Sequence, residues 1–150
     1  MTTKPILLLS LILNAAIAWG QTSIDQLQAE SMKFLADQES QGYEFQQQVV
    51  SDFSGARSTQ KAQIQLSKSD QYLIVAIGDH KVPEIDLLIK PRKGVEMQLQ
   101  TIGPNVVGKA ILLTASRPGP LKISIKTSGL DTDTKGFVNF MILRKPKAKP

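Results

Sequence analysis

The sequence has 150 residues, a formal net charge of +5, no cysteine and one histidine. The lack of cysteine excludes disulfides, thiolate metal sites and a cysteine nucleophile, and one histidine is too few for an imidazole zinc site. Most of the positive excess lies in the last seven residues and the rest is close to neutral, so the basic composition does not indicate a nucleic-acid groove.

Residues 1–20 are typical of a cleavable signal peptide. Lys4 precedes an apolar block over residues 6–13, and the small residues that follow permit cleavage before Trp19 or, as we prefer, before Gln21. A retained membrane anchor is the alternative, but the uncharged stretch is shorter than the roughly 20 residues that span a bilayer. We therefore expect a protein exported to the periplasm or the cell exterior.

Residues 21–42 are predicted to form one amphipathic helix that ends before Gly42. The stripe at helical spacing consists of Ile24, Leu27, Ser31, Phe34 and Leu35. Such a stripe either docks on the body of the domain or binds a partner, and we favour docking.

From residue 43 to residue 143 the apolar period is close to two, which predicts β-strands. The eight candidate strands are Tyr43–Phe53, Ala62–Leu66, Gln71–Ile77, Ile85–Lys90, Val95–Thr101, Lys109–Ala115, Leu121–Thr127 and Phe137–Leu143. The run from Tyr72 to Ile77 is apolar throughout, which indicates a central strand. The connections are too short for a crossover helix, so a mainly β, antiparallel sandwich or barrel follows.

An acidic turn follows Gly78, with Asp79, Glu84 and Asp86 close together in the sequence. Glu84 and Asp86 are two residues apart and share a face of a strand, so Asp79 could complete a set of carboxylates for Ca²⁺. In the alternative interpretation Lys81 neutralises the acids and Asp79 caps its own backbone. His80, on the same turn, has no Gly-x-Ser-x-Gly motif to pair with and is interpreted as solvated.

Residues 144–150 form a tail of alternating basic residues and proline that is expected to be extended or disordered. Its cations are Arg144, Lys145, Lys147 and Lys149. These residues could hold the protein to an anionic surface by charge alone, or they could be a non-specific solvated tail.

The region from Phe45 to Leu143 resembles the bacterial pre-peptidase C-terminal domain in its apolar strand, its Gly78-Asp79 turn and the strand from Glu84 to Leu87. The resemblance implies a non-catalytic, jelly-roll-like antiparallel β-sandwich, some members of which bind calcium or matrix polymers. It assigns Asp79 and Asp86 to the family's turn acids, with Glu84 in place of an aspartate. The chain departs from the family at Gly119-Pro120-Leu121, where a tyrosine is usual, and carries no peptidase.

Together these features predict a non-enzymatic binding or structural module that recognises a protein or polymer by its surface, with calcium as a stabilising ion. No specific nucleic-acid partner is expected, and no transmembrane segment is expected after signal cleavage. Two alternatives stay open. One is a small secreted hydrolase that uses a carboxylate pair, and the other is an envelope protein held to anionic surfaces by its basic tail.

Overall fold

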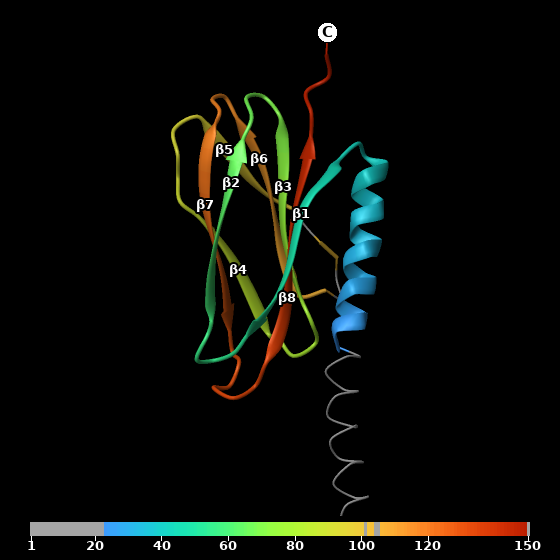
Figure 1. Cartoon of the computed structure of the whole chain (residues 1–150), viewed down its shortest axis with the longest axis vertical. Coiled ribbons are helices and arrows are strands. Elements are labelled where there is room, and N and C mark those ends of the chain that lie inside the picture. The colour runs from blue at the N-terminus through green and yellow to red at the C-terminus, as the bar shows by residue number, and fades with distance from the viewer. Residues whose placement is uncertain (1–22, 101, 104–105, 150) are drawn as a thin grey trace, which may run out of the picture.

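The computed structural model describes residues 23–100, 102–103 and 106–149, so the predicted signal peptide at 1–20 lies outside the described residues. A helix over residues 23–40 precedes eight strands (Figure 1). The strands are β1 (Glu44–Phe53), β2 (Thr59–Leu66), β3 (Gln71–Gly78), β4 (Glu84–Ile89), β5 (Val95–Gln100), β6 (Gly108–Ala115), β7 (Gly119–Ser128) and β8 (Gly136–Lys145). Each predicted strand overlaps one of these.

The strands form two antiparallel sheets, one with the order β1-β8-β3-β6-β5 and one with the order β2-β7-β4. β1 pairs with β8, β2 with β7 and β3 with β6. This nested pairing is that of a jelly roll, in which a long hairpin is rolled into a sandwich. The predicted fold class, a jelly-roll-like antiparallel sandwich with one N-terminal helix, is therefore confirmed. β4 and β5 depart from the nesting, because β5 pairs with β6 in the other sheet.

β3 shows why its sequence is apolar at nearly every position. Ile74 and Ala76 face the three-stranded sheet and lie in the main core, whereas Leu73, Val75 and Ile77 face the N-terminal helix in a second core. Successive side chains of a strand point to opposite faces, so a strand that is covered on both faces is apolar at nearly every position. The prediction that this strand is central is confirmed.

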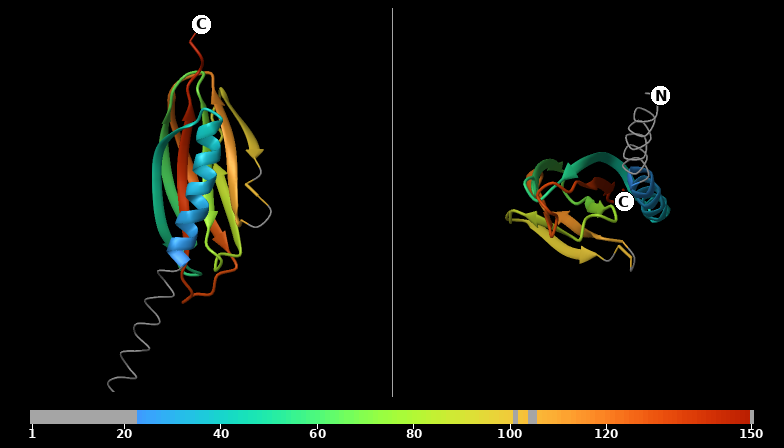
Figure 2. Two further views of the ribbon diagram at one scale, coloured as in Figure 1. Left: turned by 90° about the vertical axis from the view of Figure 1, so that its right-hand side faces the viewer. Right: turned by 90° about the horizontal axis from the view of Figure 1, so that it is seen from below.

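The N-terminal helix lies lengthwise across the outer face of the five-stranded sheet (Figure 2). Leu27 is fully buried against the sheet and Ser31 is nearly so, whereas Met32 on the opposite face is 70% exposed. Docking of the predicted stripe is thus confirmed. After the helix, Gly42 takes a φ of +93°, a conformation that favours glycine. In the described part of the chain, no helix is both long enough and apolar enough to span a membrane.

Candidate functional site

The three acids of the predicted calcium site occupy different environments, beginning with Asp79 at the end of β3. Asp79 is buried, and its Oδ1 accepts a 3.0 Å hydrogen bond from the backbone N–H of Lys81. Its Oδ2 accepts a 2.5 Å hydrogen bond from the Ser23 hydroxyl. Asp79 therefore caps its own turn and also joins that turn to the helix. His80 is exposed on this turn, as expected.

Glu84 and Asp86 lie on β4 at alternate positions, as predicted, and both are directed away from the main core. Asp86 Oδ1 lies 2.7 Å from Lys109 Nζ of β6, so this ion pair joins the two sheets. Among residues 23–100, 102–103 and 106–149, no three His, Asp or Glu side chains gather as a metal would require. Calcium binding at Asp79, Glu84 and Asp86 stays a prediction without an assembled set of ligands in the described residues.

The first two residues of the predicted basic tail, Arg144 and Lys145, belong to β8. β8 continues to Lys145, two residues further than the sequence pattern indicated. The Arg144 guanidinium is bound to Asp70, with Nη2 2.6 Å and Nε 2.8 Å from Oδ2. The backbone N–H of Lys147 donates a 2.9 Å hydrogen bond to Asp70 Oδ1. Arg144 therefore anchors the chain end, which leaves the exposed side chains of Lys147 and Lys149 for an anionic surface.

The Asp70 carboxyl accepts these bonds in a buried position. The hydrogen bond from the Lys147 backbone lowers its pKa, and the hydrogen bond and charge of Arg144 lower it further against the opposing effect of burial. Lys145 lies over the Tyr43 ring, with Nζ 5.5 Å from the ring centroid, and burial raises the pKa of the Tyr43 hydroxyl.

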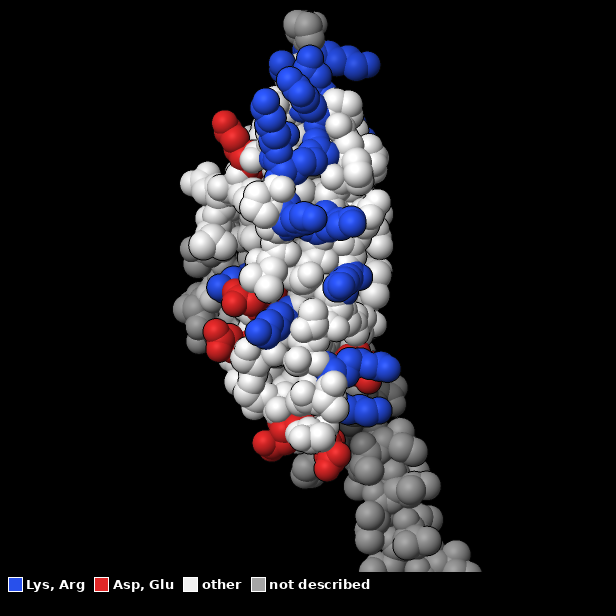
Figure 3. All heavy atoms as spheres, turned by 90° about the vertical axis from the view of Figure 1, so that its left-hand side faces the viewer, with Lys and Arg blue, Asp and Glu red and all other residues white. Residues whose placement is uncertain are grey.

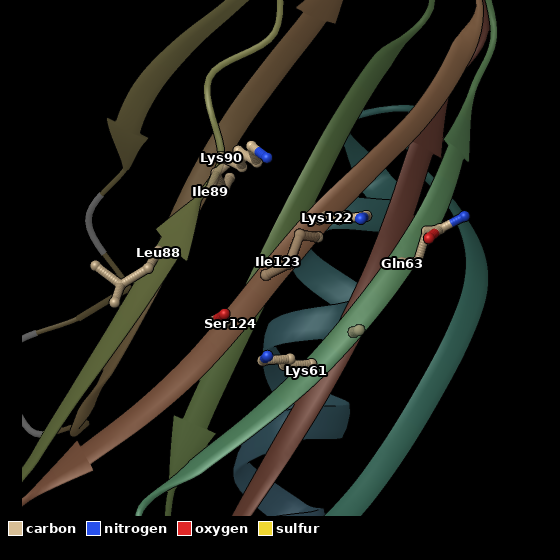
Figure 4. Close-up of a pocket in the computed structure, with 9 residues that line it drawn as sticks. Lys61, Gln63, Leu88, Ile89, Lys90, Lys122, Ile123 and Ser124 are labelled. Carbon is tan, nitrogen blue, oxygen red and sulfur yellow. The ribbon is translucent and has the colours of Figure 1, made fainter.

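Lysine and arginine side chains run down the outer face of the three-stranded sheet (Figure 3). The alternation along β2 and β7 leaves Lys61 and Lys122 exposed on this face, and Lys90 is exposed directly after β4. They line a shallow hollow of about 620 Å³, here named the lysine hollow (Figure 4). Its lining consists of Lys61, Ala62, Gln63, Leu88, Ile89, Lys90, Lys122, Ile123 and Ser124.

The pairing of the strands makes these lysines neighbours. The backbone N–H of Lys90 donates a 3.2 Å hydrogen bond to the carbonyl of Lys122, so the two residues lie directly across from each other. Lys61 is opposite Ser124 and hence diagonal to Lys122, a separation of roughly 7–8 Å between Cα atoms. Like charges directly opposite each other, as Lys90 and Lys122 are, are destabilising by a few tenths of a kcal/mol to about 1 kcal/mol.

None of these three lysines is neutralised by an acid of the described chain. The ion pairs there join Arg57 to Asp52, Lys109 to Asp86 and Arg144 to Asp70. Three adjacent, exposed cations with an apolar neighbour, Leu88, can bind a negatively charged group that also has an apolar part.

The sequence pattern did not predict that Lys61, Lys90 and Lys122 would lie together. Lys122 lies within the predicted strand Leu121–Thr127, whereas Lys61 lies just outside the predicted strand Ala62–Leu66 and belongs to β2, which begins at Thr59. The available signal was a lysine at a polar position of each of two alternating strands. That signal has no spatial meaning until β7 is known to lie between β2 and β4.

A crevice between the helix and the residues Ile102, Gly103 and Val106 bears on the carboxylate-pair alternative. Its lining includes two acids, Glu30 and Asp37, beside Phe34 and Ile77. The acids are seven residues apart on one helix, which is about 10 Å along its axis. Lys33 lies between them, one turn from each. The cation of Lys33 between the two acids does not favour the carboxylate-pair chemistry of glycoside hydrolysis in this crevice.

The chain matches no protein family, no curated protein and no solved structure.

Proposed function

We propose that this protein is an exported, non-enzymatic binding module of the bacterial periplasm or cell exterior. It recognises a negatively charged protein or polymer through the lysine hollow. The observation that carries the proposal is the cross-strand placement of Lys61, Lys90 and Lys122 without an acid partner in the described chain.

The energetics of the hollow support this role. Adjacent like charges raise the free energy of the folded state. A bound anion attracts each lysine and so offsets their mutual repulsion. The backbone beneath the hollow consists of paired strands, so no backbone segment has to be ordered on binding. The resemblance to the pre-peptidase C-terminal domain points to the same non-catalytic class. The predicted signal peptide supports an exported location.

The proposal is tested by neutralising the hollow. We expect the triple variant Lys61→Gln, Lys90→Gln and Lys122→Gln to bind poly-L-glutamate and dextran sulfate about tenfold or more weakly than the unmodified protein. Three surface charge pairs at roughly 0.3–1 kcal/mol each give a factor of this size. Binding is measured by isothermal titration calorimetry at low salt, and the salt dependence should also become less steep.

A matched control removes the same charge elsewhere, with Lys33→Gln, Lys135→Gln and Lys149→Gln, all exposed. This control should bind within about twofold of the unmodified protein. Equal losses in both triple variants would reduce the interaction to net charge and contradict the proposal. A loss in the control alone would contradict the proposal and place the interaction outside the hollow, with Lys149 of the basic tail among the removed charges.

A further inference from the structure

The two sheets of the sandwich differ in width on the side of β4 and β5. β4 is the edge of the three-stranded sheet and lies across from β6, whereas β5 extends the other sheet by one more strand. Met97 and Leu99 of β5 are register partners of Leu113 and Ile111, which belong to the main core. Yet Met97 is 46% exposed and Leu99 is 69% exposed, since the narrower sheet ends at β4.

A crevice of about 350 Å³ occupies this position, here named the edge notch. Its lining is almost entirely apolar and comes from both edge strands and β6. The lining residues are Leu87, Leu88, Ile89, Met97, Gln98, Leu99 and Ile111. The notch is therefore open on one side and bounded by the core on the other.

The backbone of β4 is ready for another strand along the notch. Lys90 donates its N–H to Lys122, so the alternation of an antiparallel ladder directs the polar groups of Leu88 and Asp86 toward β7 as well. The N–H and C=O groups of Leu87 and Ile89 then face the free edge. No hydrogen bond within the described residues engages them.

We propose that the edge notch binds one extended segment of an acidic partner polypeptide, which adds a fourth strand beside β4 and covers Met97 and Leu99. The inference rests on the proposed function and deepens it, because it names the partner's chemistry and conformation. Main-chain hydrogen bonds would supply affinity, and alternate side chains would supply specificity.

The charges on the outer face beside the notch favour an acidic segment as the added strand. Along the outer face at the notch, β4 carries Leu88 next to Ser124 and Lys90 next to Lys122, with Lys61 one strand further. Glu84 and Asp86 lie on the same face toward the other end of β4, where Asp86 is opposite Lys126 and binds Lys109, so lysines outnumber acids on these rows. At the Lys90 end of β4, an added strand with acidic side chains outward and apolar side chains inward matches both faces. The basic tail of the same chain has the wrong charge, and its prolines cannot donate to a ladder.

The width of the sheets argues against a second copy of this fold. Two copies that paired β4 with β4 antiparallel would be related by a two-fold axis perpendicular to the narrow sheet. Each overhanging β5 would then collide with β6 of the other copy, because β6 lies across from β4. A single extended segment avoids this collision.

The probe is an end-capped peptide of eight alternating glutamate and valine residues, and its affinity is measured by fluorescence titration. Two further peptides carry N-methyl groups on every valine or on every glutamate. An edge strand bonds its neighbour through only one of these alternate sets. We therefore expect one methylated peptide to bind at least tenfold more weakly and the other to keep its affinity. Equal affinities for all three peptides, or equal losses in both methylated peptides, would overturn the inference.

Protein variants locate the site. Leu99→Gln should weaken peptide binding about tenfold, because it replaces an apolar contact in the notch. The matched control, Val49→Gln, alters a 43% exposed residue on β1, at the opposite edge of the same sheet, and should have no effect. Both sites are exposed, so the fold should be retained, which circular dichroism checks.

The outcomes separate this inference from the proposed function. If the lysine variants lose binding while Leu99→Gln does not, the lysine hollow stands and the strand inference is overturned. If Leu99→Gln loses peptide binding and the lysine variants do not, the notch stands without the proposed acidic preference, and the proposed function fails. Dimerisation of the free protein that Leu99→Gln abolishes, seen by sedimentation velocity, would assign the notch to a second copy and overturn the inference.

Discussion

At the scale of single residues, Asn139 on β8 is the most unusual side chain in the described interior. It is fully buried, and neither its Oδ1 nor its Nδ2 has a hydrogen-bond partner among the described residues. By alternation it shares a face with Phe137 and Met141, beneath the N-terminal helix. An unpaired buried amide lowers stability, because the polar atoms lose their interactions with water on folding.

We expect Asn139→Leu to raise the free energy of unfolding by about 1–2 kcal/mol, because leucine has a similar size and no polar atom to satisfy. Urea unfolding followed by circular dichroism measures the change. A lower free energy in the variant would mean that Asn139 makes a stabilising contact in solution.

At the scale of elements, the N-terminal helix closes a second core that the sandwich alone would leave open. Leu27 contacts a cluster that includes Leu73, Val75 and Met141, residues on the outer face of the five-stranded sheet. Ser23 adds a polar link to Asp79 at the turn after β3. The helix is thus part of the folded domain and stabilises it by burying apolar area on the sheet.

Leu27→Ala should lower the free energy of unfolding by about 2–4 kcal/mol, because it leaves a cavity between helix and sheet. Met32→Ala, on the exposed face of the same helix, should change it by less than about 0.5 kcal/mol. Both are read from urea unfolding. Similar small effects in the two variants would show that the helix is not coupled to unfolding of the sandwich.

At the scale of the whole molecule, Asp70 joins two segments that are far apart in the sequence. It lies just before β3, binds Arg144 near the end of β8 and accepts the backbone N–H of Lys147 beyond that strand. The pKa of its carboxyl is lowered in the folded state, mainly by the Lys147 hydrogen bond and then by Arg144. Its stabilising contribution is therefore full above the unfolded pKa, near 4, and is lost as the pH falls through the lower folded pKa.

Asp70→Asn should therefore lower the free energy of unfolding by about 1–3 kcal/mol at pH 7, and the difference from the unmodified protein should shrink below about pH 4. Denaturant unfolding at a series of pH values measures it. Asp133→Asn, at an exposed loop position, serves as the control and should show no such difference. A deficit in Asp70→Asn that does not change with pH would contradict the assigned role of the carboxylate charge.

Much of the architecture could be predicted from local pattern. Alternating segments such as Leu121–Thr127 form strands because one face is buried and the other is wet, and the continuous run of β3 marks a strand covered on both faces. The end of the sandwich was less predictable. Arg144 was assigned to the tail, because its partner Asp70 is 74 residues away in the chain and local pattern does not reveal the pairing.

Closeness in the sequence was a poor guide to closeness in space at both the acidic turn and the lysine hollow. Asp79, Glu84 and Asp86 are close in the sequence, but Ser23 and Lys109, which are far away in the sequence, contact two of them. Lys61, Lys90 and Lys122 are far apart in the sequence and become neighbours only through strand order.

The amino-acid sequence alone determined that the fold is mainly β and antiparallel, and approximately where each strand lies, because those depend on the periodicity of neighbouring residues. Which side chains meet, which edge stays open and how the charge is distributed depend on pairings between distant strands. Only the tertiary structure decided these, since hydrogen-bond register and sheet width are properties of the assembled sandwich.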